Sequence, residues 1–111
     1  MRELSKIEEI LLVAICRLKD QAYGVRIRQH VSGVLDKEFT YGNLYSALHQ
    51  LTAKKFIRPA TGLPAPSRRG RPRVFYTITP AGREALQCAR ELNAKLWLGF
   101  PAFALDKDKI G

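Results

Sequence analysis

Four arginines lie within residues 67–73, which read SRRGRPR. They are Arg68, Arg69, Arg71 and Arg73. A guanidinium group binds phosphate through paired hydrogen bonds, and an arginine inserted into a narrow minor groove favours A·T base pairs. The stretch therefore indicates contact with the backbone or the minor groove of a nucleic acid.

The charge distribution of the whole chain supports the same kind of partner. The 111 residues carry a formal net charge of +9, and the stretch from Phe39 to Arg83 contains no Asp or Glu. A surface that serves only for solubility normally mixes charges of both signs. The acid-free stretch therefore favours an electrostatic footprint for a polyanion over ordinary surface charge.

Catalytic chemistry is not indicated. The two histidines, His30 and His49, have no orienting acid close in sequence, and the chain has no metal-ligand spacing, phosphate-cradling glycine loop or nucleophile elbow. Cys16 and Cys88 lack a Cys-x-x-Cys partner, so we expect buried reduced thiols, with an oxidation sensor as the alternative. The sequence thus predicts no enzyme, no metal site and no cofactor.

Apolar residues at helical spacing predict three short helices in the first half of the chain. The first covers residues 5–18, with Ser5 as the cap of a capping box. The second covers about 23–34 and ends near its glycine, and the third runs from the Thr40 cap to about residue 55. Three short consecutive helices are typical of a helix-turn-helix unit.

The third predicted helix has an apolar stripe and an opposite polar face. The stripe consists of Leu44, Ala47, Leu48 and Leu51. The polar face has small residues, side chains that both donate and accept hydrogen bonds, and no carboxylate. Its candidate DNA-binding residues are Thr40, Tyr41, Asn43, Tyr45, Ser46 and His49. The alternative is an uncharged face that contacts only solvent.

Two strand-like runs, FIRPAT at 56–61 and RVFYTIT at 73–79, flank the arginine-rich stretch. Arg-Gly-Arg-Pro also occurs in disordered AT-hook tails, but its position between two strands favours the tip of a hairpin. Thr79 and Pro80 then predict the cap and first residue of a last helix that stops near residue 99.

This order of elements predicts a mainly α fold with a small β-hairpin: a winged helix-turn-helix followed by a C-terminal dimerisation helix. We expect a DNA-binding domain at 1–79, a dimerisation helix at 80–99 in the same compact unit, and a tail at 100–111. The first apolar run is acidic at its start and too short to span a bilayer, so a soluble, cytoplasmic protein is expected, with no membrane partner.

Three stretches resemble the PadR family of bacterial transcriptional regulators over roughly residues 4–90. They are AYGVRIRQHV, TYGNLYSALHQLTAKKFI and RRGRPRVFYTITPAGREAL, in the family's order and spacing. The resemblance, which is to short-form members without a large C-terminal domain, implies a homodimeric repressor that binds an inverted-repeat operator in double-stranded DNA. It further implies that Tyr45 contacts the DNA backbone, that the arginines form a wing, and that Tyr76 is mainly structural.

Two positions differ from that family's pattern. Lys55 stands where a glycine often closes the third helix, which the resemblance implies is the recognition helix, so we expect a left-handed residue or a different cap. Some members stack flat drugs on a tryptophan of the last helix; Asn93 occupies that position here, and Trp97 lies one turn further on.

The residues expected at a dimer interface or effector site come from the first and last helices. They are Leu11, Ile15, Leu92, Asn93, Leu96 and Trp97. Binding of a small aromatic effector at Trp97 is a hypothesis whose alternative is a residue of the dimer core. For the function as a whole, the alternative is a protein that binds RNA or DNA without sequence specificity.

Overall fold

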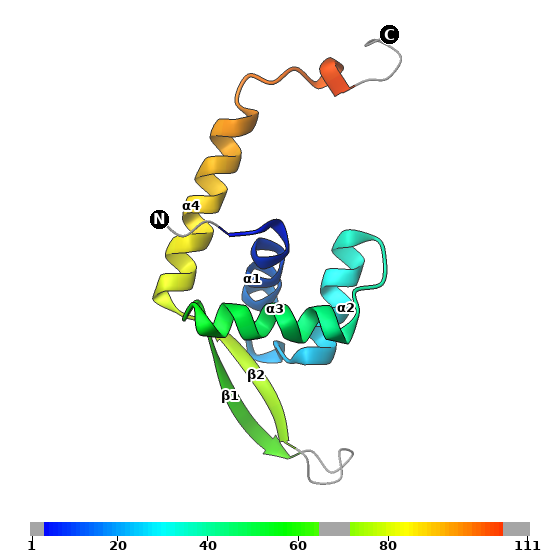
Figure 1. The fold of residues 1–111 in the computed structure, drawn as a ribbon, viewed down its shortest axis with the longest axis vertical. Coiled ribbons are helices and arrows are strands. Elements are labelled where there is room, and N and C mark those ends of the chain that lie inside the picture. Colours follow the sequence, from blue (N-terminus) through cyan, green and yellow to red (C-terminus); the bar gives the residue numbers. More distant parts are fainter. Residues whose placement is uncertain (1–3, 65–71, 106–111) are drawn as a thin grey trace.

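The computed structural model describes residues 4–64 and 72–105, and its elements follow the predicted order. They are α1 (Lys6–Leu18), the 3-10 turn η1 (Lys19–Gln21), α2 (Gly24–Leu35), α3 (Tyr41–Ala53), β1 (Ile57–Pro64), β2 (Pro72–Ile78), α4 (Pro80–Trp97) and η3 (Ala102–Leu105). The first three helices form one body, the β1–β2 hairpin extends from it, and α4 projects in another direction (Figure 1). This arrangement confirms the mainly α, winged helix-turn-helix fold.

The caps recognised in the sequence start three of the four α-helices. The Glu8 backbone N–H donates to Ser5 Oγ at 3.1 Å, and the Glu8 carboxylate accepts from the Ser5 backbone N–H at 2.9 Å. Thr40 Oγ1 accepts from the Asn43 N–H, and Thr79 Oγ1 accepts from the Gly82 N–H. Each cap satisfies a backbone donor that the first helical turn leaves unpaired, so the predicted starts are confirmed.

The second helix continues past its predicted end. Gly33 lies inside α2, which ends at Leu35, and Asp36 adopts the left-handed conformation with φ 55°. A glycine inside a helix costs only about 1 kcal/mol, which packing of the apolar face can offset. The helix therefore ends at Asp36, whose short polar side chain tolerates a positive φ.

A core contributed mainly by the first three helices holds this body together. Its buried members are Leu11, Leu12, Ala14, Ile15, Ala22, Ile27, Val31, Phe39, Leu44, Ala47, Leu48, Leu51, Phe56 and Ile57. Leu11 and Ile15 belong to it, with exposed fractions of 0% and 2%. The prediction that these two lie at a dimer interface is therefore wrong, because their own chain already covers them.

The cysteine prediction also needs correction. Cys16 is exposed on α1 and Cys88 is half-buried on α4, and both are free thiols. Cys16 follows the buried Ile15 but lies on the side of α1 that the core does not cover.

The hairpin is antiparallel, with register from Ile57 opposite Ile78 to Thr61 opposite Val74, and an irregularity before its outer end. Its base is attached to the segment before α2, where the Tyr76 N–H donates to the Ala22 carbonyl at 2.9 Å. Among residues 4–64 and 72–105, no helix is both long and apolar enough to cross a membrane.

Candidate nucleic-acid interface

The exposed face of α3 brings together all six residues predicted from its sequence. Leu44, Leu48 and Leu51 are buried against the body, so the opposite side of the helix points outward. The six predicted residues are all exposed: Thr40, Tyr41, Asn43, Tyr45, Ser46 and His49. The helical period therefore places the polar residues on one surface, as the sequence predicted.

Two of these side chains form an aromatic pair. The Tyr41 and Tyr45 rings stack with centroids 6.2 Å apart, and the guanidinium carbon of Arg28 lies 4.5 Å from the centre of the Tyr41 ring. Sequence reasoning did not select Arg28 as a site residue. The available signal was its position four residues after Gly24, on the same face of α2.

Tyr45 lies where α2, α3 and the hairpin meet. An ideal Cβ built on Gly24 would lie 2.6 Å from the Tyr45 hydroxyl oxygen, so this hydroxyl packs directly against the glycine and would have to shift for a larger residue. Burial raises the pKa of Tyr76 above its ordinary value, and the neighbouring Tyr45 adds to that rise. Tyr45 thus joins the polar face of α3 to the base of the wing.

Arg73 is the one arginine of residues 67–73 that the structure describes. Its guanidinium lies 4.3 Å from the centre of the Tyr23 ring, and Tyr23 contacts the edge of Phe75 at 5.5 Å between centroids. Its Nε is buried and has no hydrogen-bond partner among the described residues. The predicted wing arginines Arg68, Arg69 and Arg71 lie outside the described residues.

An ion pair between the buried Glu8 and the half-buried Lys54 holds the C-terminal end of α3. Glu8 is only 4% exposed, and its carboxylate lies 2.5 Å from Lys54 Nζ. Burial raises the pKa of Glu8, but hydrogen bonds from Lys54 and from the Ser5 backbone outweigh it, so the pKa lies below its ordinary value. The start of α1 is thereby joined to the end of the candidate recognition helix.

The end of α3 has the left-handed residue expected at Lys55. Its φ is 65°, the Lys55 N–H donates to the Thr52 carbonyl at 2.9 Å, and the Phe56 N–H donates to the Leu51 carbonyl at 3.0 Å. These two bonds form a Schellman motif, which ordinarily uses glycine at this position. The prediction of a left-handed residue is confirmed.

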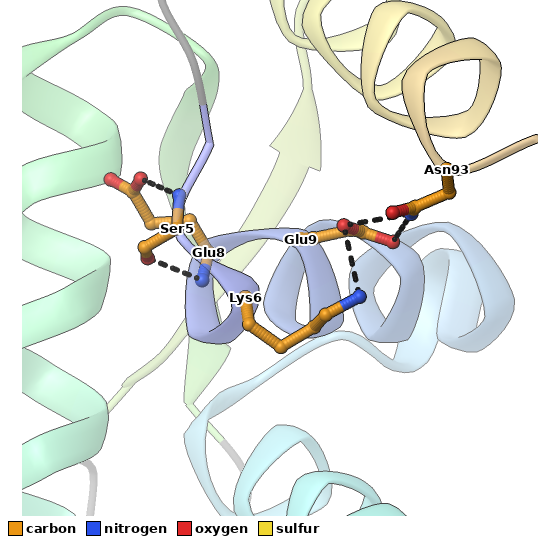
Figure 2. A network of polar contacts seen from close by, with 5 residues as sticks. All are labelled: Ser5, Lys6, Glu8, Glu9 and Asn93. Atoms are coloured by element: carbon orange, nitrogen blue, oxygen red, sulfur yellow. Dashed lines mark hydrogen bonds and ion pairs between the residues drawn. The ribbon is translucent and has the colours of Figure 1, made fainter. Parts of the chain in front are cut away.

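Asn93 and Trp97 lie in different surroundings on α4. Asn93 Nδ2 donates to both Glu9 carboxylate oxygens, at 3.1 and 3.4 Å, and Lys6 approaches the same carboxylate at 3.5 Å (Figure 2). Trp97 is 53% exposed and contacts the edge of Phe100.

A groove of about 330 Å³ opens beside Asn93, and Trp97 is not among its described lining residues. Asn93 thus joins α4 to α1 through Glu9, whereas Trp97, one turn further on, takes no part in that bond.

Residues 11–88 match the model of the transcriptional regulator PadR-like family. The chain belongs to this family. It is thus a PadR-family transcriptional regulator, from a family that binds DNA and is not enzymatic. No group of three His, Cys, Asp or Glu residues that could hold a metal ion occurs within the part of the chain that the structure describes.

Solved structures of similar regulators agree with this assignment. A PadR-family transcription regulator from Clostridium difficile is 26% identical, with a TM-score of 0.60, and the match covers 84% of this chain and 96% of that one. A transcriptional regulator from Clostridium thermocellum is 25% identical, with a TM-score of 0.62 and coverage of 85% and 91%. RosR of Halobacterium salinarum, at 18% identity, shares the fold, with a TM-score of 0.69 over 98% of this chain and 91% of that one.

A curated relative is a much longer protein. An uncharacterized 37.1 kDa protein in transposon TN4556 of Streptomyces fradiae is 34% identical over 86 residues. The match covers 77% of this PadR-family chain but only 23% of that protein.

Proposed function

We propose that this PadR-family chain acts as a homodimeric repressor of a nearby promoter, binding an inverted-repeat operator in double-stranded DNA. The observation that carries the proposal is the exposed face of α3, where Asn43, Ser46 and His49 are exposed and the helix itself carries no carboxylate. Amide, hydroxyl and imidazole groups can each form hydrogen bonds with base edges in the major groove. In this proposal α3 is the recognition helix.

Electrostatic attraction supports the same surface. The chain has no acidic residue between Phe39 and Arg83, so both α3 and the hairpin are free of groups that repel phosphates. The wing arginines Arg68, Arg69, Arg71 and Arg73 then bind the flanking backbone or enter the minor groove.

Exposed apolar residues on α4 support a dimer. Leu92 and Leu96 are one helical turn apart and are 57% and 65% exposed, and Trp97 beside them is 53% exposed. A contiguous apolar surface of this kind is usually covered by another chain. Two copies paired through α4 place two recognition helices in successive major grooves, about 34 Å apart on one face of the duplex.

Control by an effector is a further part of the proposal. A flat aromatic molecule would stack on Trp97 within the dimer interface, and the competing role for Trp97 is packing in the dimer core. Titration of aromatic ligands against tryptophan fluorescence separates the two, since Trp97 is the single tryptophan of the chain. An unchanged spectrum over a broad panel would exclude the effector site at this residue.

A second candidate function is binding of RNA or DNA without sequence specificity. The stacked pair Tyr41 and Tyr45, 43% and 50% exposed, favours it, because exposed aromatic rings can stack on unpaired bases. Selection of bound duplexes from a random pool tests both functions. Recovery of an inverted repeat supports the repressor, whereas random recovery, or stronger binding to single strands or RNA, supports the second function.

A further inference from the structure

Arg28 on α2 makes two contacts with the beginning of α3. Its guanidinium lies over the Tyr41 ring at 4.5 Å, and its Nη1 donates to the Phe39 carbonyl at 3.4 Å. Phe39 is buried and directly precedes the Thr40 cap. One side chain of α2 therefore contacts both the entry to the candidate recognition helix and its first aromatic ring.

The contact continues along both helices at the same spacing. Gly24 and Arg28 are four residues apart on α2, and Tyr41 and Tyr45 are four residues apart on α3. Residues at this spacing lie on one face of a helix. Arg28 contacts Tyr41, and Gly24 lies against the Tyr45 hydroxyl. The later residue of the α2 pair therefore contacts the earlier residue of the α3 pair, and the earlier residue of α2 contacts the later residue of α3.

We propose that Arg28 is a positioning residue for DNA binding, which holds the Tyr41–Tyr45 stack in the orientation that fits the DNA backbone. The proposal rests on the proposed function of α3 as a recognition helix. A guanidinium is flat and can lie on an aromatic ring while its edge donates a hydrogen bond. Arg28 therefore fixes the orientation of the Tyr41 ring, and the Tyr41 ring in turn orients the Tyr45 ring that stacks on it.

The surroundings of Arg28 favour positioning over direct contact with phosphate. Its Nε is buried and has no hydrogen-bond partner among the described residues, and its Nη1 faces the Phe39 carbonyl. Bidentate binding of phosphate uses two guanidinium N–H groups, and burial of Nε together with the Nη1 bond leaves fewer of them for it. Arg26, two residues earlier, is exposed and makes no such stack in the part of the chain that the structure describes.

Four single variants of the full chain, and the double variant that combines Arg28→Ala with Tyr41→Leu, test the proposal. Arg28→Ala removes the stack, Arg28→Lys keeps the charge without the flat group, and Tyr41→Leu removes the ring. Arg26→Ala removes the same charge from an exposed site of α2 and is the matched control. The probe is a fluorescent mixed-sequence duplex of about three helical turns, titrated over a range of salt concentrations at a temperature where every variant is folded.

The expected result is a change in affinity without a change in salt dependence. Arg28→Ala should bind about tenfold more weakly at every salt concentration, with the slope of log affinity against log salt unchanged. Arg28→Lys should be nearly as weak, because an ammonium group cannot lie flat on the ring and also reach the Phe39 carbonyl. Adding Arg28→Ala to Tyr41→Leu should cause little further loss, because Arg28 acts through the Tyr41 ring.

Two outcomes of the binding experiment overturn the proposal. If Arg28→Ala lowers the slope by about one unit and Arg28→Lys restores binding, Arg28 is a phosphate ligand. If Arg28→Ala binds no more weakly than Arg26→Ala, the stack has no role in binding.

A readout without DNA separates this proposal from the proposed function. The methylene protons next to the Arg28 guanidinium should resonate upfield in the free protein because they lie over the Tyr41 ring, and Tyr41→Leu should abolish that shift. If the wild-type chain shows the shift but binds no nucleic acid, both the proposed function and the positioning role are wrong. A wild-type chain that binds duplex but lacks the shift overturns the positioning role alone.

Discussion

The carbonyl oxygen of Phe56 occupies the space that a Cβ atom on residue 82 would need, so Gly82 is required where α4 begins. The same junction has two further bonds, from the Thr79 N–H to the Phe56 carbonyl at 3.0 Å and from Thr79 Oγ1 to the Lys55 carbonyl at 2.7 Å. The start of the proposed dimerisation helix is therefore attached directly to the end of the proposed recognition helix.

Gly82→Ala should destabilise the fold by about 3 kcal/mol, because the added methyl group overlaps a backbone atom that cannot rotate away. Gly33→Ala is the matched control: no described atom lies within 4 Å of a Cβ there, and Gly33 lies inside α2. That substitution should stabilise the protein by about 0.5–1 kcal/mol through helix propensity. Urea unfolding measures both, and equal effects at the two glycines would contradict the close approach at Gly82.

Lys55→Gly should stabilise the protein by about 0.5–1 kcal/mol, because glycine adopts the φ of 65° without steric cost. Lys55→Ala is the control, since it removes the same side chain but keeps the Cβ atom in a left-handed conformation. The free energy of unfolding of the glycine variant should exceed that of the alanine variant. Equal stabilities would mean that the left-handed conformation carries no strain here.

Stability should depend on pH through the part-buried Glu8–Lys54 pair. Because the pKa of Glu8 is lower in the folded chain, its contribution is complete above the ordinary value of 4.5 and is lost as the pH falls through the folded value. Glu8→Gln should cost about 1–3 kcal/mol at neutral pH and remove this part of the acid sensitivity. Urea unfolding at several pH values measures it, and Glu38→Gln, at an exposed site, is the control. If the stability of the wild type and that of Glu8→Gln fell equally with pH, the pair would not be a source of the acid sensitivity.

Local signals made the helices and the polar face of α3 predictable. Caps such as Ser5 and Thr79 act within one turn, and the apolar period of α3 decides which side chains point outward. The left-handed residue at Lys55 was one of two alternatives that the family resemblance implied, the other being a different cap, because family members often have glycine there.

Contacts between distant segments were not predictable in this way. The Arg28–Tyr41 stack depends on how α2 crosses α3, and the bond from Asn93 to Glu9 joins residues 84 positions apart. Leu11 and Ile15 were placed at an interface because α1 is apolar on more than one side, and the sequence does not say which neighbour covers each side.

Leu96→Glu should weaken dimer formation by roughly a hundredfold, because it introduces an unpaired charge into the proposed apolar interface on α4. Val34→Glu, at a similarly exposed apolar residue of α2, should leave the dimer intact. Light scattering after size exclusion, over a range of protein concentrations, measures the molecular mass. A Leu96→Glu variant that remains as dimeric as the wild type would remove α4 from the proposed interface.

Ser46→Ala and His49→Ala should change which operators are preferred, whereas Arg71→Ala should weaken binding to all sequences alike. Each lost base contact should cost about 1–3 kcal/mol at one base-pair position, because the hydrogen-bonding pattern of a base edge is read there. Loss of one phosphate contact should instead lower the slope of the salt dependence by about one unit. Competition binding with a set of single-position operator variants measures the first effect, and salt titration measures the second. If Ser46→Ala and His49→Ala leave the ranking of operators unchanged, the reading face of α3 has been assigned wrongly, even where the protein still binds DNA through its wing.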